Sequence, residues 1–167
     1  MATVVANVLV GTGTLYYHTT PGTAVGGVTT EFGYTKDGVT IEYSSSVNDI
    51  EVEEETFAIK RVIQKEEFTV TCNLSENLLA NLENAMAGAL TGGAGIVDLG
   101  GGAQRAMALK FTGVAPGGTT RTIYIPYANP VGTVGMAYKK GEETLIPASF
   151  KAYQGVSGAD VVTITDA

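Results

Sequence analysis

The feature that most constrains this chain is a strict alternation of apolar and polar side chains between residues 66 and 74. Successive side chains of a β-strand point to opposite sides of the sheet, so this pattern predicts a strand with one buried and one solvated face. The predicted buried face holds Phe68, Val70, Cys72 and Leu74. The predicted solvated face holds Glu67, Thr69, Thr71 and Asn73.

Further strands are expected along most of the chain. The turn signal Asp37-Gly38 predicts a hairpin that joins a strand at residues 29–34 to one at residues 39–43. Other predicted strands lie at residues 57–63, 106–114, 120–126, 131–138, 144–153 and 161–165. With 22 glycines in 167 residues and only 16% charged side chains, the composition also favours strands and turns. We therefore predict one mainly β domain over residues 1–167, with about eight to ten strands.

A single amphipathic helix is predicted after residue 74. Ser75 is the expected N-cap and Gly88 the expected stop. The apolar stripe of this helix is expected to face the sheet beside Phe68 and Val70, with asparagine and glutamate on the opposite side. The predicted core residues of the stripe include Leu78, Leu82 and Met86. Residues 1–10 are expected to form an N-terminal arm, and residues 88–105 a glycine-rich loop.

Composition excludes several kinds of chemistry. One cysteine and one histidine leave no internal disulfide, no cysteine zinc site and no histidine-rich metal centre. No phosphate-binding or dinucleotide-binding glycine motif is present, and His18 has no nucleophile at a suggestive spacing. We therefore expect no enzyme activity, no cofactor and no metal. No stretch of about 18 apolar residues is present, so we expect no contact with a membrane.

Acidic residues are the remaining feature. The net charge is −7, which argues against a groove that grips the phosphates of nucleic acid. Residues 49–55 read DIEVEEE, and Asp49, Glu51, Glu53 and Glu55 would share one face if this segment were a strand. Three interpretations are open: a solvated strand or loop, a pair of glycosidase carboxylates, or a surface that repels anions. The second is disfavoured, because a row of like charges does not place two acids in different environments.

The order of these elements is similar to that of the major tail tube proteins of tailed bacteriophages. The similarity runs from about residue 11 to residue 153. It rests on the threonine- and glycine-rich start VLVGTGTLYYHTTPGTA, the strand-to-helix junction FTVTCNLSENLLANLENAMAG and the closing strand TLIPASFKAY. The resemblance implies a β-sandwich or split barrel with one flanking helix. It also implies hexameric rings that stack into a hollow tube through which DNA leaves the capsid.

Several expectations follow from this resemblance. The partners would be further copies of the chain, together with tape measure, terminator and baseplate or tip proteins, and DNA would pass without adhering. The protein would assemble in the host cytoplasm and reside in the tail of the virion. Residues 1–10 and 88–105 are apolar or glycine-rich and have no expected partners within the chain, so we predict that they form contacts between subunits or rings. If the helix covers the outer face of the sheet, the polar face lines the bore. The lumen candidates are then Glu67, Thr69, Thr71 and Asn73, joined by Glu53, Glu55 and Glu66.

A β-sandwich binding module, such as a carbohydrate-binding or adhesin domain, is the alternative. Such a module would share the composition. It usually displays exposed aromatic rings that stack on sugars, whereas this chain has no tryptophan and its eight tyrosines fall mostly in strand patterns. Rings or hollow rods of purified protein would favour the tube, and a persistent monomer would favour the module.

Overall fold

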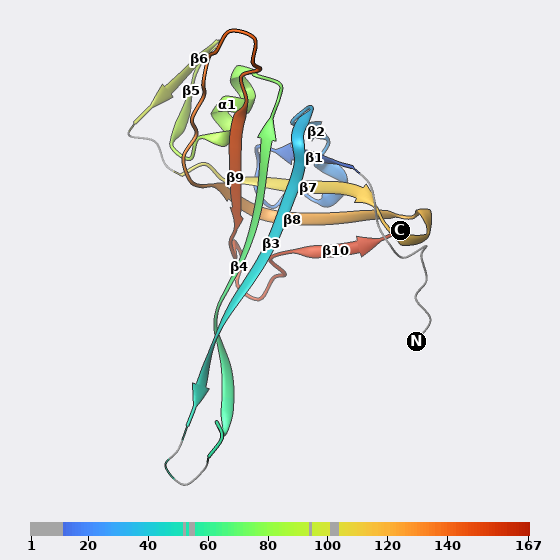
Figure 1. The fold of residues 1–167 in the computed structure, drawn as a ribbon, viewed down its shortest axis with the longest axis vertical. Coiled ribbons are helices and arrows are strands. Elements are labelled where there is room, and N and C mark those ends of the chain that lie inside the picture. The colour runs from blue at the N-terminus through green and yellow to red at the C-terminus, as the bar shows by residue number, and fades with distance from the viewer. Residues whose placement is uncertain (1–11, 52, 54–55, 94, 101–103) are drawn as a thin grey trace.

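The structure is a computed structural model that describes residues 12–51, 53, 56–93, 95–100 and 104–167 (Figure 1). The predicted N-terminal arm, residues 1–10, therefore lies outside the described residues. The strands are β1 (Gly13–His18), β2 (Thr30–Glu31), β3 (Thr35–Ile50), β4 (Lys60–Leu74), β5 (Ala89–Gly93), β6 (Ile96–Leu99), β7 (Met107–Val114), β8 (Thr120–Pro130), β9 (Ile146–Ala152) and β10 (Thr163–Asp166). Within these ranges there is one α-helix, α1 (Leu79–Ala85), and there are two 3-10 turns, Val25–Gly27 and Pro116–Gly118.

Eight strands form one antiparallel sheet in the order β2-β1-β7-β8-β9-β4-β3, with β10 paired to β8. The sheet is not closed into a barrel. A separate two-stranded sheet is made of β5 and β6. The predicted fold class, mainly β with one helix, is thus confirmed.

The core lies where the two halves of the large sheet meet. In Figure 1, β7 and β8 run across the view, whereas β9, β4 and β3 run along its length. Alternate residues of both halves point into the space between them, so each half covers the apolar face of the other. The most buried large side chains of this core include Leu15, Phe32, Leu74, Met107, Leu109, Ile146 and Phe150.

The first predicted hairpin is wrong. Thr30 and Glu31 pair with Tyr17 and Tyr16 of β1, not with β3. Asp37 and Gly38 do adopt positive φ angles, 63° and 77°, but they form a bulge inside β3. Two consecutive residues with positive φ fit a bulge as well as a turn. Strand β3 therefore continues past them and pairs with β4.

Two other segments also differ from the prediction. Residues 131–138 form no strand, although Val134 and Met136 pack against the core. Their apolar pattern reflects burial, and Val131 N donates a hydrogen bond to Ser149 O of β9 at 2.8 Å although no strand follows. Residues 88–105 are not simply a loop, because β5 and β6 form an antiparallel hairpin there.

The helix is shorter than predicted. Its N-cap is Leu78, which has an extended backbone, and its C-cap is Met86. Leu78 is 56% exposed, so its assignment to the core is wrong. The cause is the later start of the helix, which leaves Leu78 outside the first turn. Leu82 does pack against the core, and Met86 is half-buried.

Asparagine lies on the buried side of α1 rather than opposite it. Asn81 and Asn84 are each 2% exposed. The Asn81 amide donates to the backbone oxygens of Phe32 (2.9 Å) and Glu76 (3.0 Å). The Asn84 Oδ1 accepts a hydrogen bond from Arg105 Nε at 3.0 Å, and Arg105 also pairs with Glu83 at 2.6 Å. These bonds satisfy the buried amides and fix the short helix to segments distant in sequence.

Candidate interaction surfaces

The predicted polar face exists and spans three strands. Val70, Cys72 and Leu74 are buried in the core and Phe68 packs against it, so Glu67, Thr69, Thr71 and Asn73 point the other way. Register adds neighbours to this face from the strands on both sides of β4. They are Thr40, Glu42 and Ser44 of β3, and Ser149 and Lys151 of β9. The result is a surface of small hydroxyl side chains with a few charges; we call it the polar face.

The polar face is not free of cations. Glu67 accepts a hydrogen bond from Lys151 Nζ at 2.6 Å and also pairs with Lys65. These hydrogen bonds, from Lys151 first and Lys65 second, lower the pKa of Glu67 to about 2. Glu67 is therefore locally neutralised, and Glu42 has no hydrogen bond or ion pair within the described part of the chain. Glu42 is the exposed acid of this face whose charge is left unbalanced.

The three other acidic candidates do not join the polar face. Glu66 lies on the opposite side of β4, where it accepts a hydrogen bond from the Tyr43 hydroxyl at 2.6 Å. Glu53 lies in a turn beyond the end of β3, because that strand ends at Ile50. The row of acids from Asp49 to Glu55 is thus not one strand face. Glu55 lies outside the described residues.

The second surface is a hairpin arm, defined as residues 43–50 of β3 and 60–68 of β4. These residues extend beyond β9, which pairs with β4 only from Thr69 onward. Figure 1 shows the arm projecting from the rest of the molecule along its longest axis. An antiparallel register holds the two strands together, and Arg61 forms a two-point ion pair with Asp49 at 2.6 and 2.8 Å.

Apolar side chains on the arm are open to solvent. Val47 and Ile63 are directly paired across the two strands, and both are about half exposed. Other exposed apolar residues of the arm are Tyr43, Ile50 and Val62. Phe57, which is 85% exposed, and Ile59 lie just before the arm's second strand. These side chains lie on both faces of the ribbon, because Val62 and Ile63 are consecutive residues of one strand and point to opposite sides.

The outer edge of β3 is also bare. Within the described chain, no strand pairs with this edge along all sixteen residues of β3. Soluble proteins usually protect such an edge with lysine or proline. Between Val39 and Ile50 the strand contains neither. Bulges after Lys36 and after Ser46 interrupt this edge, and the stretches of β3 between and beyond them remain open to another strand.

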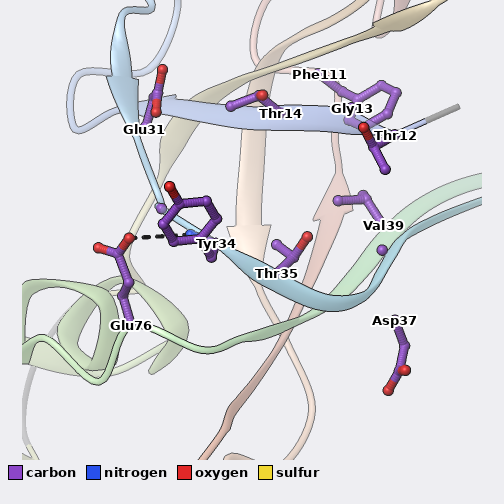
Figure 2. A pocket seen from close by; sticks show the side chains of 12 residues that line it. Thr12, Gly13, Thr14, Glu31, Tyr34, Thr35, Asp37, Val39, Glu76 and Phe111 are labelled. Carbon is purple, nitrogen blue, oxygen red and sulfur yellow. Dashed lines mark hydrogen bonds between the residues drawn. The ribbon is translucent and has the colours of Figure 1, made fainter.

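The third surface is a seam between the two ends of the open sheet. β2 is only two residues long, so at Gly13 and Thr14 the edge of the sheet is β1 itself. Between this edge and the start of β3 lies a hollow of about 880 Å³. Figure 2 shows Thr12 and Thr14 on one side of the hollow and Thr35 and Val39 on the other.

Specific contacts hold the residues on both sides of the seam in place. The Glu76 carboxylate accepts a hydrogen bond from the Tyr34 backbone N–H at 3.3 Å (Figure 2). On the other side, the Phe111 ring lies directly over Gly13. A Cβ atom at Gly13 would come within 2.1 Å of Phe111 Cζ, so glycine is required for this close approach. Phe111 and Val39, which pack against the core, also line the hollow.

Chemical machinery is not evident on any of these surfaces. No group of three metal-ligating side chains occurs among the residues that the structure places. Burial raises the pKa of the Cys72 thiol to about 12, which leaves it unreactive at neutral pH. No helix in the described ranges is long and apolar enough to cross a bilayer.

Comparison with models of known protein families finds no match, and comparison with curated protein sequences finds none.

Sequence reasoning missed the arm and the seam. Residues 43–50 and 60–66 do not alternate between apolar and polar side chains, so the sequence contained only a weak strand signal there and none for the projection of the arm. The strands themselves, sixteen and fifteen residues long, far exceed the usual strand of about 5–6 residues. The seam depends on which strands become neighbours, and that is a property of topology.

Proposed function

We propose that this chain is a structural subunit that assembles with copies of itself into stacked rings, forming a hollow tube like those of the bacteriophage tail proteins it resembles. The observation that carries the proposal is the hairpin arm. A two-stranded ribbon alone is marginally stable in water, and this one exposes apolar side chains and a bare strand edge. Packing the arm against neighbouring subunits would remove both costs.

A second copy of the chain is the partner that best fits the arm. Soluble oligomers are mostly built from identical subunits, and a head-to-tail contact closes into a ring when its rotation permits. The bare edge of β3 lies at one end of the sheet, and β2 and β10 present further edges elsewhere on the molecule. Joining unlike edges gives the head-to-tail contact that a ring needs.

The polar face fits the bore of such a tube. Hydroxyl side chains from β3, β4 and β9 give a surface without large apolar groups, and Glu42 adds unbalanced negative charge. A basic bore would retain DNA through release of its counterions, whereas a neutral or acidic bore lets it slide. The proposal includes the tape measure, terminator and tip proteins as partners and the virion tail as the location.

The test is electron microscopy of the purified chain together with a matched pair of variants. Val47→Ser/Ile63→Ser removes the paired apolar side chains of the arm. The control Val156→Ser removes an exposed apolar side chain from a loop outside the arm. The free energy of unfolding of both variants should lie within about 0.5 kcal/mol of the wild-type value, because all three substituted side chains are exposed. We expect tubes or rings from the wild type and the control, and loss of assembly in the arm variant.

Two results would count against this proposal. A wild-type protein that stays monomeric at high concentration would remove its basis. Normal tubes from Val47→Ser/Ile63→Ser would show that the apolar arm is not the contact.

One observation favours the binding-module alternative. Tyr34 is 81% exposed at the mouth of the seam, and the carboxylates of Glu31, Asp37 and Glu76 line the same hollow (Figure 2). An exposed aromatic ring beside carboxylates can stack on a sugar and accept hydrogen bonds from its hydroxyls. Binding to a glycan array that is lost in Tyr34→Ala, with a monomeric wild type, would support this function instead.

A further inference from the structure

We propose that the arm pairs edge to edge with the arms of neighbouring copies, so that residues 43–50 of β3 in one copy lie antiparallel to residues 60–66 of β4 in the next. This contact rests on the proposed self-assembly and names the surface that receives the arm. It joins two unlike edges of the same two-stranded ribbon.

Both edges of the arm are open. β3 is the last strand of the large sheet, so its outer edge pairs with no strand of the described chain. β4 pairs with β9 only from Thr69 to Leu74, so residues 60–66 also have no strand beside them, among the described residues, on the side away from β3. Unpaired backbone groups along a strand edge are a template for another strand. An isolated ribbon is only marginally stable in water, so added strands would stabilise the arm.

Joining β4 of one copy to β3 of the next continues the alternation of strand directions. The two strands run antiparallel within the arm, so a copy placed beside it in the same orientation presents its β3 antiparallel to the β4 edge. The edges lie on opposite sides of the ribbon, and the same contact can therefore repeat from copy to copy. Such a head-to-tail contact closes into a ring when its rotation permits.

The irregularity within the arm is compatible with this pairing. The register of β3 and β4 shifts between Ser46 and Val47, and the ladder then continues to Ile50. A bulge bends a strand and leaves one residue unpaired, but pairing resumes beyond it. Each edge therefore offers two short stretches that a neighbouring strand can follow.

Charge distinguishes the two edges and selects unlike pairing. Residues 60–65 of β4 include three cations and no acid, whereas residues 43–51 include two acids, Asp49 and Glu51, and no cation. Lys60 and Glu51 are exposed, and neither forms an ion pair within the described chain. Opposite charges on adjacent strands attract, and like charges repel. Pairing β3 with β4 of another copy brings unlike charges together, whereas a two-fold pairing of β3 with β3, or of β4 with β4, brings like charges together.

The contact is tested by disulfide crosslinking between full-length variants that each gain one cysteine. One preparation carries Val62→Cys on β4, and the other carries Ser46→Cys, Asn48→Cys or Ile50→Cys on β3. Asn48 lies directly opposite Val62 within the arm, so the same two positions meet in a neighbour that is not shifted along the strand. The flanking positions allow for a shift of two residues either way. No chain holds both new cysteines, and Cys72 is buried, so every crosslink joins two copies.

The two preparations are mixed before assembly, oxidised gently and analysed on a non-reducing gel. We expect covalent dimers that contain up to about half of the chains, because a chain in a head-to-tail ring meets the other variant at about half of its contacts. Directly paired strands provide the short separation of Cα atoms that a disulfide requires. Each preparation alone should stay uncrosslinked.

A matched control uses opposed positions in the body of the sheet. Thr40→Cys mixed with Thr71→Cys repeats the geometry of Asn48 and Val62, but there β9 covers the far edge of β4. This mixture should give no dimers. Dimers from it at the level of the arm variants would mean that the crosslinks arise from random collision, and would overturn the contact.

The outcomes separate this contact from the proposed function. Tubes without crosslinks at any of the three β3 positions would overturn the arm contact and keep the tube. Crosslinks in a preparation that carries only a β3 cysteine would show two-fold pairing and overturn the head-to-tail contact. Crosslinks of the expected pattern in protein that forms no tubes would keep the arm contact and remove the tube.

Discussion

At the scale of single residues, the most informative group is Glu67. The alternation of β4 predicted its orientation, but its two lysine partners come from different positions: Lys65 two residues away and Lys151 on the neighbouring strand β9. Because Glu67 is paired with two lysines, its negative charge adds little to the net charge of the polar face. It also makes the stability of the fold depend on pH in a definite direction.

The first prediction concerns that dependence. Glu67 has an ordinary pKa of 4.5 in the unfolded chain and about 2 in the folded one. A depressed folded pKa means that the carboxylate stabilises the fold fully above about pH 5, and that this stabilisation is lost as the pH falls from about 4.5 to about 2. The urea midpoint of Glu67→Gln should therefore lie below that of the wild type at pH 7, and the gap should close by about pH 2.

Glu42→Gln is the control for this titration, because Glu42 lies in the row beside Glu67 on the same face and has no ion pair among the described residues. It should show no such closing gap. A gap for Glu67→Gln that stays constant from pH 7 to pH 2 would contradict the pairing.

At the scale of elements, α1 shows what local signals capture. The sequence placed a helix after β4, and a helix is there. Its start was predicted three residues too early, because Ser75 and Glu76 form a good local N-terminus. In the structure these residues instead bind Tyr34, between β2 and β3: Ser75 N donates to Tyr34 O at 2.9 Å, and Glu76 accepts from Tyr34 N. A long-range contact therefore overrides the local capping preference.

The second prediction tests the buried side of this helix. Leu82 packs against the core, whereas Leu78 is exposed. Leu82→Ala should lower the free energy of unfolding by about 2 kcal/mol, the low end for a leucine truncation, because the side chain is only partly buried. Leu78→Ala, the matched control, should change it by less than about 0.5 kcal/mol. Equal losses in denaturant unfolding would mean that the helix presents a different side to the sheet.

How far the sequence predicts this fold differs from element to element. Alternation correctly separated the two faces of β4, because side-chain direction in a strand depends only on the local backbone. The pairing of one strand with another was harder to predict. Residues 29–34 were assigned to β3 by proximity in sequence, yet they pair with β1, and the buried Asn81 finds its acceptor on Phe32, 49 residues away. No local pattern encodes these pairings, and the seam that results from them could not be predicted.

At the scale of the whole molecule, the shape itself carries the argument. A two-stranded arm projects from the rest of the molecule, and the outer edge of β3 along it pairs with no strand of the described chain (Figure 1). The net charge of −7 is spread over a chain in which most lysines and arginines already have acidic partners. Each added subunit in a ring would therefore bring further uncompensated negative charge toward the same surfaces, screened beyond about 8–10 Å in physiological salt.

The last prediction asks whether the polar face lines the bore. Glu42→Lys is a sharper test than a change at Glu67, because replacing Glu67 with lysine would also bring three cations together and disturb the fold. Glu42 is exposed and has no ion pair in the described chain, so Glu42→Lys should fold with nearly unchanged stability. Asp98→Lys, the control, places the same charge change on exposed strand β6 of the separate two-stranded sheet. In particles that carry the variant tube, we expect Glu42→Lys to slow DNA ejection, most strongly at low salt, because each lysine that contacts a phosphate adds salt-dependent attraction. Asp98→Lys should eject at the wild-type rate. If Glu42→Lys particles eject as fast as the wild type at low ionic strength, the polar face does not meet DNA and lies on the outside of the assembly.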